Sequence, residues 1–391
     1  MMSKIPLTLV ALVALVALVA PDAPDAPDAP AQASPWKQAA PGYVFSFPRD
    51  HAAHPDFKIE WWYYTGNVTT ADGRRFGYQV TFFRVGIDYA PANPSKWAVR
   101  DLYMTHLAVS DAKGQRYRYA EKLTRGGPGL AGAKVDTYYT WNDDWTAGIR
   151  DQGSGIGDQG SGKKPQHVLS AKSPQAGIDL VLDEGKAPAI NGINGINQKG
   201  AREGNASHYY SLTRMPTKGT LTIDGERFEV TGLTWMDHEF STSFLEPEQR
   251  GWDWFSIQLS DNRELMLYRM RRADGSHDPR SSGTLIDANG RTTHLSNDDF
   301  TLTPGRSTFK SKNGAVYPTE WTVSIPSHKI ELTVTTPLSD QELSLVESTG
   351  IAYWEGMIDV TGRSGGQVVR GSGYLEMTGY HSSLGRVLTG S

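Results

Sequence analysis

Hydrophobic and polar residues alternate with a period of two over much of this chain. Across residues 76–82, aromatic or aliphatic side chains at every second position share one face, and Gln79 and Thr81 lie on the other. Dipeptides that favour tight turns separate such segments: Asp72-Gly73, Asp224-Gly225, Asp274-Gly275, Asn289-Gly290 and Asn313-Gly314. No long amphipathic helix pattern follows residue 33. The pattern predicts an all-β fold of short strands joined by hairpins, arranged as sandwiches or barrels.

Two parts of the chain share a weak internal repeat. Residues 61–68 lead through a turn into 76–84, and residues 252–259 lead through Asp261-Asn262 into 265–271. Each unit is a Trp-rich strand, a turn and an alternating strand that ends in Arg. The repeat favours two similar domains, although any two hairpins can share such a pattern.

Three tandem micro-repeats interrupt the alternation. They are residues 21–30, the duplicated Asp-Gln-Gly-Ser-Gly at 151–155 and 158–162, and residues 190–197. Extra residues cost little in exposed loops, because the entropy of loop closure grows slowly with loop length. We therefore expect residues 148–165 and 186–204 to be exposed loops that tolerate deletion of either micro-repeat. Residues 142–205 should be the least structured part of the chain after residue 33.

The amino terminus has the features of a secretory signal peptide. Lys4 precedes an apolar run over residues 7–20, and Ala31-Gln32-Ala33 offers a small-residue cleavage site. The run is short for a membrane span, although a retained anchor is the alternative. We expect residues 1–33 to be removed and the protein to be exported to the periplasm or the extracellular space.

Composition narrows the functional classes. The length after residue 33 suggests about two domains of about 150 residues each. A formal net charge of −4 over 391 residues gives no reason to expect nucleic acid as a partner. The absence of Cys excludes disulfides, thiol catalysis and zinc–thiolate sites, whereas 11 Trp and 17 Tyr supply large areas for burial.

Ionisable side chains set among tryptophans are the strongest chemical signal. They occur at residues 47–63, at 235–241 and at 353–356. Indole rings around a carboxyl group disfavour its charged form and raise its pKa, so that it can donate a proton at neutral pH. The structural alternatives are that Asp237 caps a turn and that Glu60 and Glu355 pair with Arg.

Other chemistries are less well supported. His51, His54 and His238 could bind a metal with nearby carboxylates, but the His-x-x-His spacing lies in a Pro-bounded loop and specifies no third ligand. We therefore predict no metal and no cofactor. Neither a Gly-x-Ser-x-Gly nucleophile elbow nor a nucleotide-binding loop is present, and a hydrolase would lack a visible nucleophile.

Several motifs resemble those of the carotenoid 1,2-hydratase-like family, which includes bacterial secreted proteins often associated with ABC-transporter systems. The matching segments are Phe47-Pro48-Arg49-Asp50-His51, Glu60-Trp61-Trp62-Tyr63, Trp235-Met236-Asp237-His238-Glu239, Gly251-Trp252-Asp253-Trp254 and residues 373–380. The resemblance runs from about residue 45 to 380. It implies two lipocalin-like β-barrel domains in tandem, at 42–240 and 248–385. It also implies cofactor-independent addition of water to a carbon–carbon double bond.

The resemblance carries over to single residues. The family's Asp-His motif matches Asp237-His238, and Phe240 stands where the hydratases tend to have Trp. A downstream strand of the hydratases carries a Tyr and an Asp. Tyr268 matches that Tyr, but no Asp lies in the strand around it, which weakens the case for hydration.

Together these observations predict a site at the junction of the two barrels. Asp237 or Glu239 would be the proton donor, His238 would orient water, and Tyr268 would complete the catalytic set. The expected ligand-binding residues are Glu60, Trp61, Trp235, Phe240, Trp252 and Trp254. We predict an exported monomer that binds a lipophilic small molecule and adds water to it. The alternative is a non-catalytic lipid-binding protein of an ABC-transporter export system.

Overall fold

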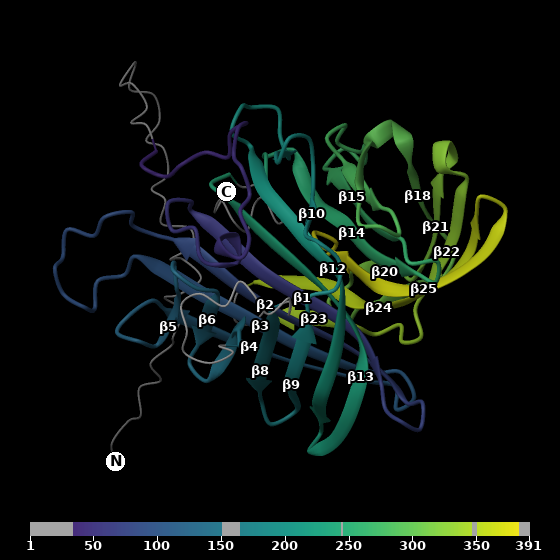
Figure 1. The fold of residues 1–391 in the computed structure, drawn as a ribbon, viewed down its shortest axis with the longest axis horizontal. Helices are drawn as coiled ribbons and strands as arrows, with labels where there is room; N and C mark the ends of the chain where they lie inside the picture. Colours follow the sequence, from purple (N-terminus) through teal and green to yellow (C-terminus); the bar gives the residue numbers. More distant parts are fainter. Residues whose placement is uncertain (1–33, 151–164, 244, 346–349, 383–391) are drawn as a thin grey trace, which may run out of the picture.

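The computed structural model describes residues 34–150, 165–243, 245–345 and 350–382, and nearly all of them lie in or between β-strands (Figure 1). Helical turns in these ranges are the 3-10 segments η2 (Arg49–His51), η3 (Asn297–Asp299) and η4 (Pro326–His328). Within the same ranges, no helix is long and apolar enough to cross a membrane. The predicted signal peptide lies outside the described residues.

The first sheet has 13 strands, in the order β4-β3-β2-β1-β13-β12-β9-β8-β7-β6-β5, with β10 and β11 also paired to β12. Neighbours along this path are consecutive along the chain, except where β1 meets β13 and where β12 meets β9. The bounds are β1 (Ile59–Thr69), β2 (Arg75–Gly86), β3 (Asp101–Asp111), β4 (Arg116–Arg125), β5 (Ala131–Ala133), β6 (Tyr139–Asn142), β7 (Trp145–Ile149), β8 (Gln166–Lys172), β9 (Ala176–Asp183), β10 (Ala189–Ile190), β11 (Asn197–Gln198), β12 (Ala206–Ile223) and β13 (Glu226–Ser241).

The second sheet has ten strands and repeats this order as β17-β16-β15-β14-β25-β24-β22-β21-β18, with β23 paired to β24. A separate hairpin, β19 (Thr308–Lys310) with β20 (Val316–Pro318), lies beside it. The bounds are β14 (Gln249–Leu259), β15 (Glu264–Arg272), β16 (Ser282–Ile286), β17 (Thr292–Ser296), β18 (Thr301–Pro304), β21 (Glu320–Ile325), β22 (Ile330–Thr335), β23 (Glu342–Leu345), β24 (Ile351–Ser364) and β25 (Gln367–Met377).

The first sheet is a nearly closed up-and-down barrel. Strands β4 and β5 are the two ends of the sheet, and the barrel is open between them. The Asn142 amide of β6 reaches across it, donating to the Lys122 carbonyl of β4 at 3.1 Å and to the Tyr103 carbonyl of β3 at 3.3 Å. The prediction of an all-β chain with two lipocalin-like barrels is confirmed, while the exact domain limits stay a prediction.

The first hairpin of each sheet, β1–β2 and β14–β15, contains a cross-strand ion pair. The Glu60 and Arg84 positions lie opposite each other on β1 and β2 and form an ion pair of 3.1 Å. Asp253 and Arg269 lie opposite each other on β14 and β15 and pair at 3.2 Å. The Trp-rich hairpins of the internal repeat therefore begin each barrel with an equivalent cross-strand ion pair.

The predicted turns lie where the sequence placed them. The best example joins β12 to β13, where Asp224 has φ of 51° and Gly225 has φ of 83°. Positive φ at both positions is the requirement of the two-residue hairpin turn that matches strand twist.

One prediction about loops is wrong. The 186–204 segment is not simply exposed, because β10 and β11 pair with β12 and the side chains of Asn191 and Asn197 are buried. The prediction that residues 142–205 are the least structured part stays a prediction, although they contain β7, β8 and β9. β8 and β9 form one hairpin, and buried positions alternate along β8, so the alternation rule applies to them as well. The duplicated Asp-Gln-Gly-Ser-Gly lies outside the described residues.

Each barrel has its own apolar core, and a third cluster joins them. This third cluster contains Tyr63, Trp235 and Trp254 and lies between the facing walls of the two sheets. Gly77 of β2 permits the close approach, since a Cβ there would lie 2.6 Å from the Tyr374 hydroxyl oxygen of β25. The junction is therefore packed like a protein interior.

Candidate functional site

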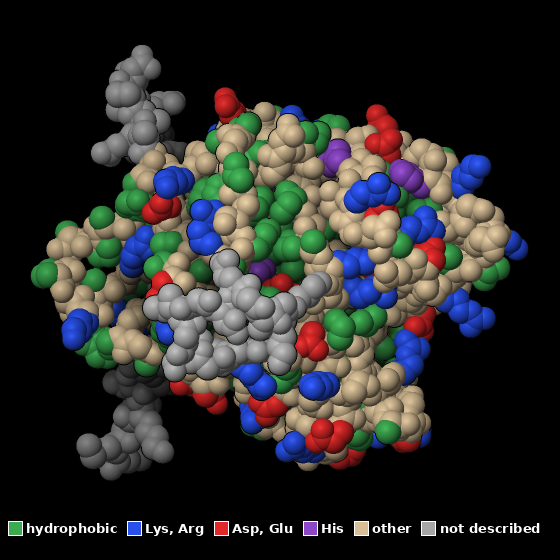
Figure 2. Space-filling view, viewed as in Figure 1, with side chains coloured by type: hydrophobic (Ala, Val, Ile, Leu, Met, Phe, Trp, Pro, Cys, Tyr) green, Lys and Arg blue, Asp and Glu red, His purple; other side chains and the backbone are tan. Residues whose placement is uncertain are grey.

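A cavity of about 230 Å³ lies at the junction of the two sheets. Its walls come from β1, β2, β3, β12 and β13 of the first sheet and from β14, β15, β24 and β25 of the second. Most lining side chains are aromatic or aliphatic. Hydrophobic side chains also gather near the middle of the face drawn in Figure 2, over the region where the sheets meet. The position and lining suit an apolar ligand, because ligand sites favour domain interfaces.

Strand β13 supplies two acids to this cavity, both from one of its faces. Asp237 and Glu239 line the cavity, and Trp235 on the same face packs in the junction cluster. His238 and Phe240 point instead into the first barrel. The expectation that Asp237 and His238 share one pocket is wrong, because successive side chains of a strand point to opposite faces.

Strand β1 divides the predicted ligand-binding residues in the same way. Trp61 lines the cavity, whereas Glu60 lies inside the first barrel and is fully buried. Trp252 and Trp254 reach the cavity from β14, and Tyr268 reaches it from β15. The structure thus brings six predicted site residues into one cavity. They are the acids Asp237 and Glu239, the tryptophans Trp61, Trp252 and Trp254, and Tyr268.

Asp237 is a buried acid that keeps its proton near neutral pH. Burial raises its pKa to about 7, and this effect outweighs the hydrogen bonds that favour the carboxylate. The Ser211 hydroxyl donates to Oδ1 at 2.5 Å and the Trp235 indole N–H donates to the same oxygen at 2.8 Å. Both donors contact Oδ1, and the Tyr209 hydroxyl is a third hydrogen-bond partner of the carboxyl group.

A second pair of carboxyl groups faces the same cavity. Glu355 of β24 and Glu376 of β25 occupy directly opposite positions on neighbouring strands. Burial raises the pKa of both groups, and the charge of Glu376 raises that of Glu355 further. The Trp252 indole donates to Glu376 Oε2 at 2.9 Å. Repulsion between the two like charges therefore favours states in which at least one of the two carboxyl groups is neutral.

Lys199 brings a positive charge to the cavity. Its Nζ lies 2.8 Å from Glu239 Oε1, and it stands over the Tyr268 ring at 4.8 Å from the centroid. Burial alone would lower the pKa of Lys199, but the neighbouring Glu239 carboxylate reverses this and the pKa is raised. The Tyr268 hydroxyl is already engaged, because it donates to Asn197 Oδ1 at 2.5 Å.

Three buried polar atoms of the cavity wall have no partner in hydrogen-bond geometry among the described residues. They are the Tyr63 hydroxyl oxygen, His106 Nε2 and Glu355 Oε1. His106 is held neutral because burial lowers its pKa to about 3, and its Nδ1 lies 2.6 Å from the Tyr353 hydroxyl. Tyr63 and Glu355 interact with each other across this wall. Because buried polar groups are normally satisfied, His106 Nε2 is the atom best placed to contact a ligand.

The residues that point into the first barrel form a different kind of cluster. Glu60 Oε1 lies 2.9 Å from both His238 Nε2 and His54 Nδ1, and Oε2 accepts from Arg84. Phe240 stacks on His54 with ring centroids 3.7 Å apart. Although burial opposes it, these partners lower the pKa of Glu60, and burial lowers that of His238 to about 4. The structural alternative for Glu60, pairing with Arg, is therefore the observed one.

The sequence model of the AttH-like family matches residues 38–380. The chain belongs to the AttH-like family. The crystal structure of a Nitrosomonas europaea protein assigned as AttH is similar to it at 33% identity and a TM-score of 0.76, covering 88% of this chain and 99% of that one. The resemblance to carotenoid hydratase-like, lipocalin-like proteins is thereby confirmed.

Two named enzymes are similar to this chain at lower sequence identity. The crystal structure of kievitone hydratase from Nectria haematococca has the same fold, with a TM-score of 0.65 at 18% identity, and it covers 89% of this chain and 98% of that chain. Dehydratase asqC of Emericella nidulans is 23% identical over 218 residues. That match spans 54% of this chain and 60% of the dehydratase. The chain therefore shares its fold with a protein named as a hydratase.

Four charged or titratable residues of the cavity are absent from the predicted site. The aromatic segment 353–356 singles out Glu355 without placing it in the site, and Glu376 enters only as part of the 373–380 motif. Lys199 was hidden in a segment expected to be a loop, and His106 lies in an otherwise unremarkable strand. The one available signal was Glu355 beside Trp354, because a carboxyl group in an aromatic run is the same pattern that singled out Asp237.

Proposed function

We propose that this AttH-like protein is a cofactor-independent hydro-lyase that adds water to, or removes water from, a lipophilic small molecule in the junction cavity. The observation that carries the proposal is the buried Asp237, whose pKa is raised to about 7 inside an aromatic cavity. A protonated carboxyl group in such a place is a general acid at neutral pH.

The proposed reaction starts with transfer of the Asp237 carboxyl proton to one carbon of an alkene. The carbocation formed at the other carbon lies among Trp61, Trp252 and Trp254, whose ring faces stabilise positive charge. Water then attacks the cation, and its proton passes to a carboxylate, either Asp237 or the Glu355–Glu376 pair. Dehydration of an alcohol is the same sequence in reverse.

The cavity volume limits what the site holds. Pockets for drug-sized ligands enclose about 300–1,000 Å³, and this one encloses about 230 Å³. We propose that the cavity takes the reacting end of a longer apolar molecule, with the remainder lying along half-buried residues such as Phe83 and Ile351.

The alternative is a lipophile-binding protein without catalysis, working with an ABC-transporter export system. Such a protein needs the apolar walls but gains nothing from buried acids. Three carboxyl groups of raised pKa around a single cavity are costly to fold. They favour the catalytic proposal over simple binding.

Asp237→Asn tests the proposal, with Asp179→Asn on the exposed face of β9 as the matched control. Lipophilic compounds with a trisubstituted alkene, and the matching tertiary alcohols, are incubated in ¹⁸O-water and analysed by mass spectrometry. We expect a loss of turnover by about 100-fold or more in Asp237→Asn, as for removal of a general acid. Affinity, followed by Trp fluorescence, should be nearly unchanged. Ligand binding without turnover in the parent protein would favour the carrier instead.

We also propose that the protein is exported and that residues 1–33 are removed. The support is the apolar run followed by Ala31-Gln32-Ala33. N-terminal sequencing of the protein from the native host should give a start near Ser34. A start at Met1 in a membrane fraction would mean a retained anchor.

A further inference from the structure

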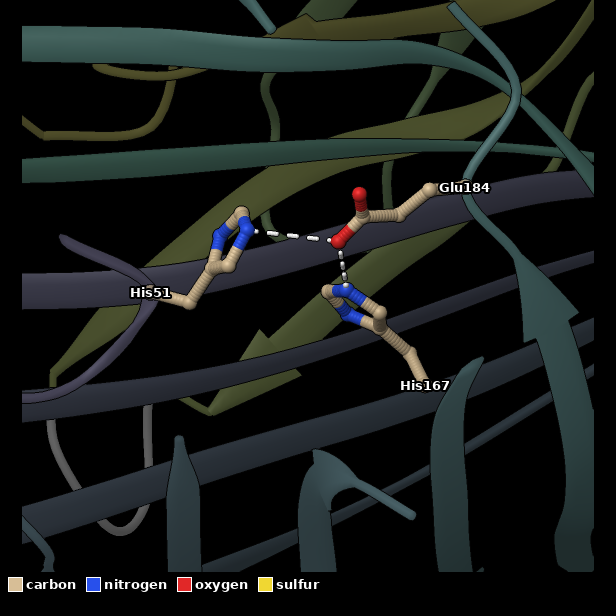
Figure 3. A group of neighbouring side chains, drawn as sticks. All are labelled: His51, His167 and Glu184. Carbon is tan, nitrogen blue, oxygen red and sulfur yellow. Dashed lines mark hydrogen bonds and ion pairs between the residues drawn. The ribbon is translucent and has the colours of Figure 1, made fainter. Parts of the chain in front are cut away.

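A second group of ionisable residues lies inside the first barrel, away from the junction cavity. Its members are His51 of η2, His167 of β8 and Glu184, which directly follows β9. Figure 3 shows both imidazole rings pointing toward one oxygen of the carboxylate. His51 Nε2 lies 3.2 Å and His167 Nε2 lies 3.0 Å from Glu184 Oε1.

These distances are close to those between ligands of a tetrahedral metal ion. Nitrogen and oxygen ligands about 2.0–2.1 Å from zinc lie about 3.3 Å from one another. Two imidazoles and one carboxylate form a donor set that zinc uses in sites with an open fourth position. The side chain of Glu184 keeps 11% of its surface exposed, whereas the two histidines are buried. An ion and its water ligand can therefore approach along Glu184.

The other ring nitrogens are held by tyrosines. His51 Nδ1 lies 2.7 Å from the Tyr210 hydroxyl, and His167 Nδ1 lies 3.0 Å from the Tyr64 hydroxyl. Each hydroxyl has another acceptor for its own proton: Tyr210 donates to the Asp50 carbonyl, and Tyr64 lies 2.7 Å from the Tyr138 hydroxyl. Both tyrosine oxygens can thus accept an Nδ1–H, which leaves the Nε2 lone pairs facing Glu184. Ligand histidines are normally oriented by such contacts.

The neighbouring group of His54, Glu60 and His238 differs in charge. Glu60 is paired with Arg84, so a metal ion there would meet a guanidinium group. Among the described residues, Glu184 has no lysine or arginine partner, and its ion-pair contacts are the two histidines. The carboxylate of Glu184 is therefore the one left for an added cation.

We propose that His51, His167 and Glu184 bind a divalent first-row transition metal ion, with Zn²⁺ as the best match to the donor set. The ion would fasten the segment before β1, which carries His51, to the wall formed by β8 and β9. In a chain without cysteine, such a site performs the cross-linking that a disulfide performs elsewhere.

The test uses the whole protein freed of metal by a chelator. Calorimetric titration with Zn²⁺ should give one equivalent, and Co²⁺ should give the visible absorption of a tetrahedral complex. We expect His167→Gln and Glu184→Gln to bind at least about 100-fold more weakly, whereas His328→Gln in η4 and His54→Gln should bind as the parent does. Tyr64→Phe keeps all three ligands and should weaken binding by about 10–100-fold, the range for a lost outer-shell contact.

Near-ultraviolet circular dichroism of each metal-free variant separates folding from binding, and Tyr64→Phe supports the proposal even where a ligand variant fails to fold. Absence of saturable Zn²⁺ and Co²⁺ binding by the folded parent would overturn it. So would equal binding by a folded His167→Gln, or loss of binding in His54→Gln alone.

Discussion

The interior of the first barrel and the junction cavity both bury carboxyl groups, yet the two environments shift the pKa of these groups in opposite directions. Inside the barrel, Glu60 contacts two imidazoles and a guanidinium, and its pKa is lowered. At the junction, Asp237 has only neutral donors within hydrogen-bond distance, and burial raises its pKa to about 7. Glu60 and Asp237 belong to neighbouring strands, so burial alone does not decide the charge of an acid. The partners on each face of the sheet decide it.

The largest expected effect comes from breaking the charge balance inside the barrel. Glu60→Gln removes the carboxylate that pairs with Arg84 and contacts His54 and His238. Arg84 keeps its ion pair with Asp101, but the change breaks a buried ion-pair network, which costs about 3–5 kcal/mol, to be measured by urea unfolding at pH 7. Glu376→Gln makes the same change at the junction and should cost far less, because it relieves repulsion with Glu355. An equal loss of unfolding free energy in Glu60→Gln and Glu376→Gln would contradict this difference between the barrel interior and the junction.

The pH dependence of stability should separate the two regions next. Asp237 keeps its proton to about pH 7 in the folded chain but only to about pH 4 when unfolded. Folded-state stability from this group therefore falls as pH rises from about 4 to about 7, by up to about 4 kcal/mol. The stability of Asp237→Asn relative to the parent should rise over that range. A constant difference between pH 4 and pH 8 would show that the carboxyl group does not titrate there.

Glu60 should behave with the opposite sign. Its folded-state pKa is lowered, so its contribution is present above the unfolded value of about 4.3 and is lost as pH falls through the folded value. Urea unfolding of Glu60→Gln and the parent should therefore converge toward low pH. Divergence there would be contrary to a lowered pKa.

A smaller effect is expected from the contact between the sheets. In Gly77→Ala, the new Cβ would lie 2.9 Å from Met357 Cβ and 2.6 Å from the Tyr374 hydroxyl oxygen. Such overpacking costs about 1–3 kcal/mol. Thermal unfolding measures it, and Trp fluorescence reports whether the junction cavity changes. An unchanged melting temperature would mean that the side chains at the junction can shift to accept the added methyl group, which a tightly packed core does not allow.

The smallest effect is expected outside both regions. Deletion of residues 158–162 removes one copy of the duplicated Asp-Gln-Gly-Ser-Gly. A shorter loop should shift the melting temperature by only a few degrees, for a change of about 1 kcal/mol or less. Loss of folding would contradict this prediction and show that the repeat is packed.

The fold was accessible from sequence because alternation and turn dipeptides are local signals. Asp224-Gly225 marks its hairpin without any knowledge of tertiary structure. Only part of the candidate site could be predicted from the sequence. Alternation along β13 already separates Asp237 from His238, so their shared pocket could have been rejected. In contrast, the proximity of Glu376 and Glu355 to Asp237 depends on how two barrels dock, and no local pattern encodes that.

The edge formed by β10 and β11 has a consequence for how this chain can evolve. Between Ile190 and Asn197 the chain advances seven positions while β12 advances three, from Tyr210 to Ser207. Loss of one Ile-Asn-Gly unit would leave a single extra residue, which is the definition of a β-bulge. Replication slippage can therefore lengthen or shorten this edge in whole units without moving Lys199 from its place after β11. The coding repeat gives the lineage a heritable way to vary one rim of the junction while both barrels stay intact.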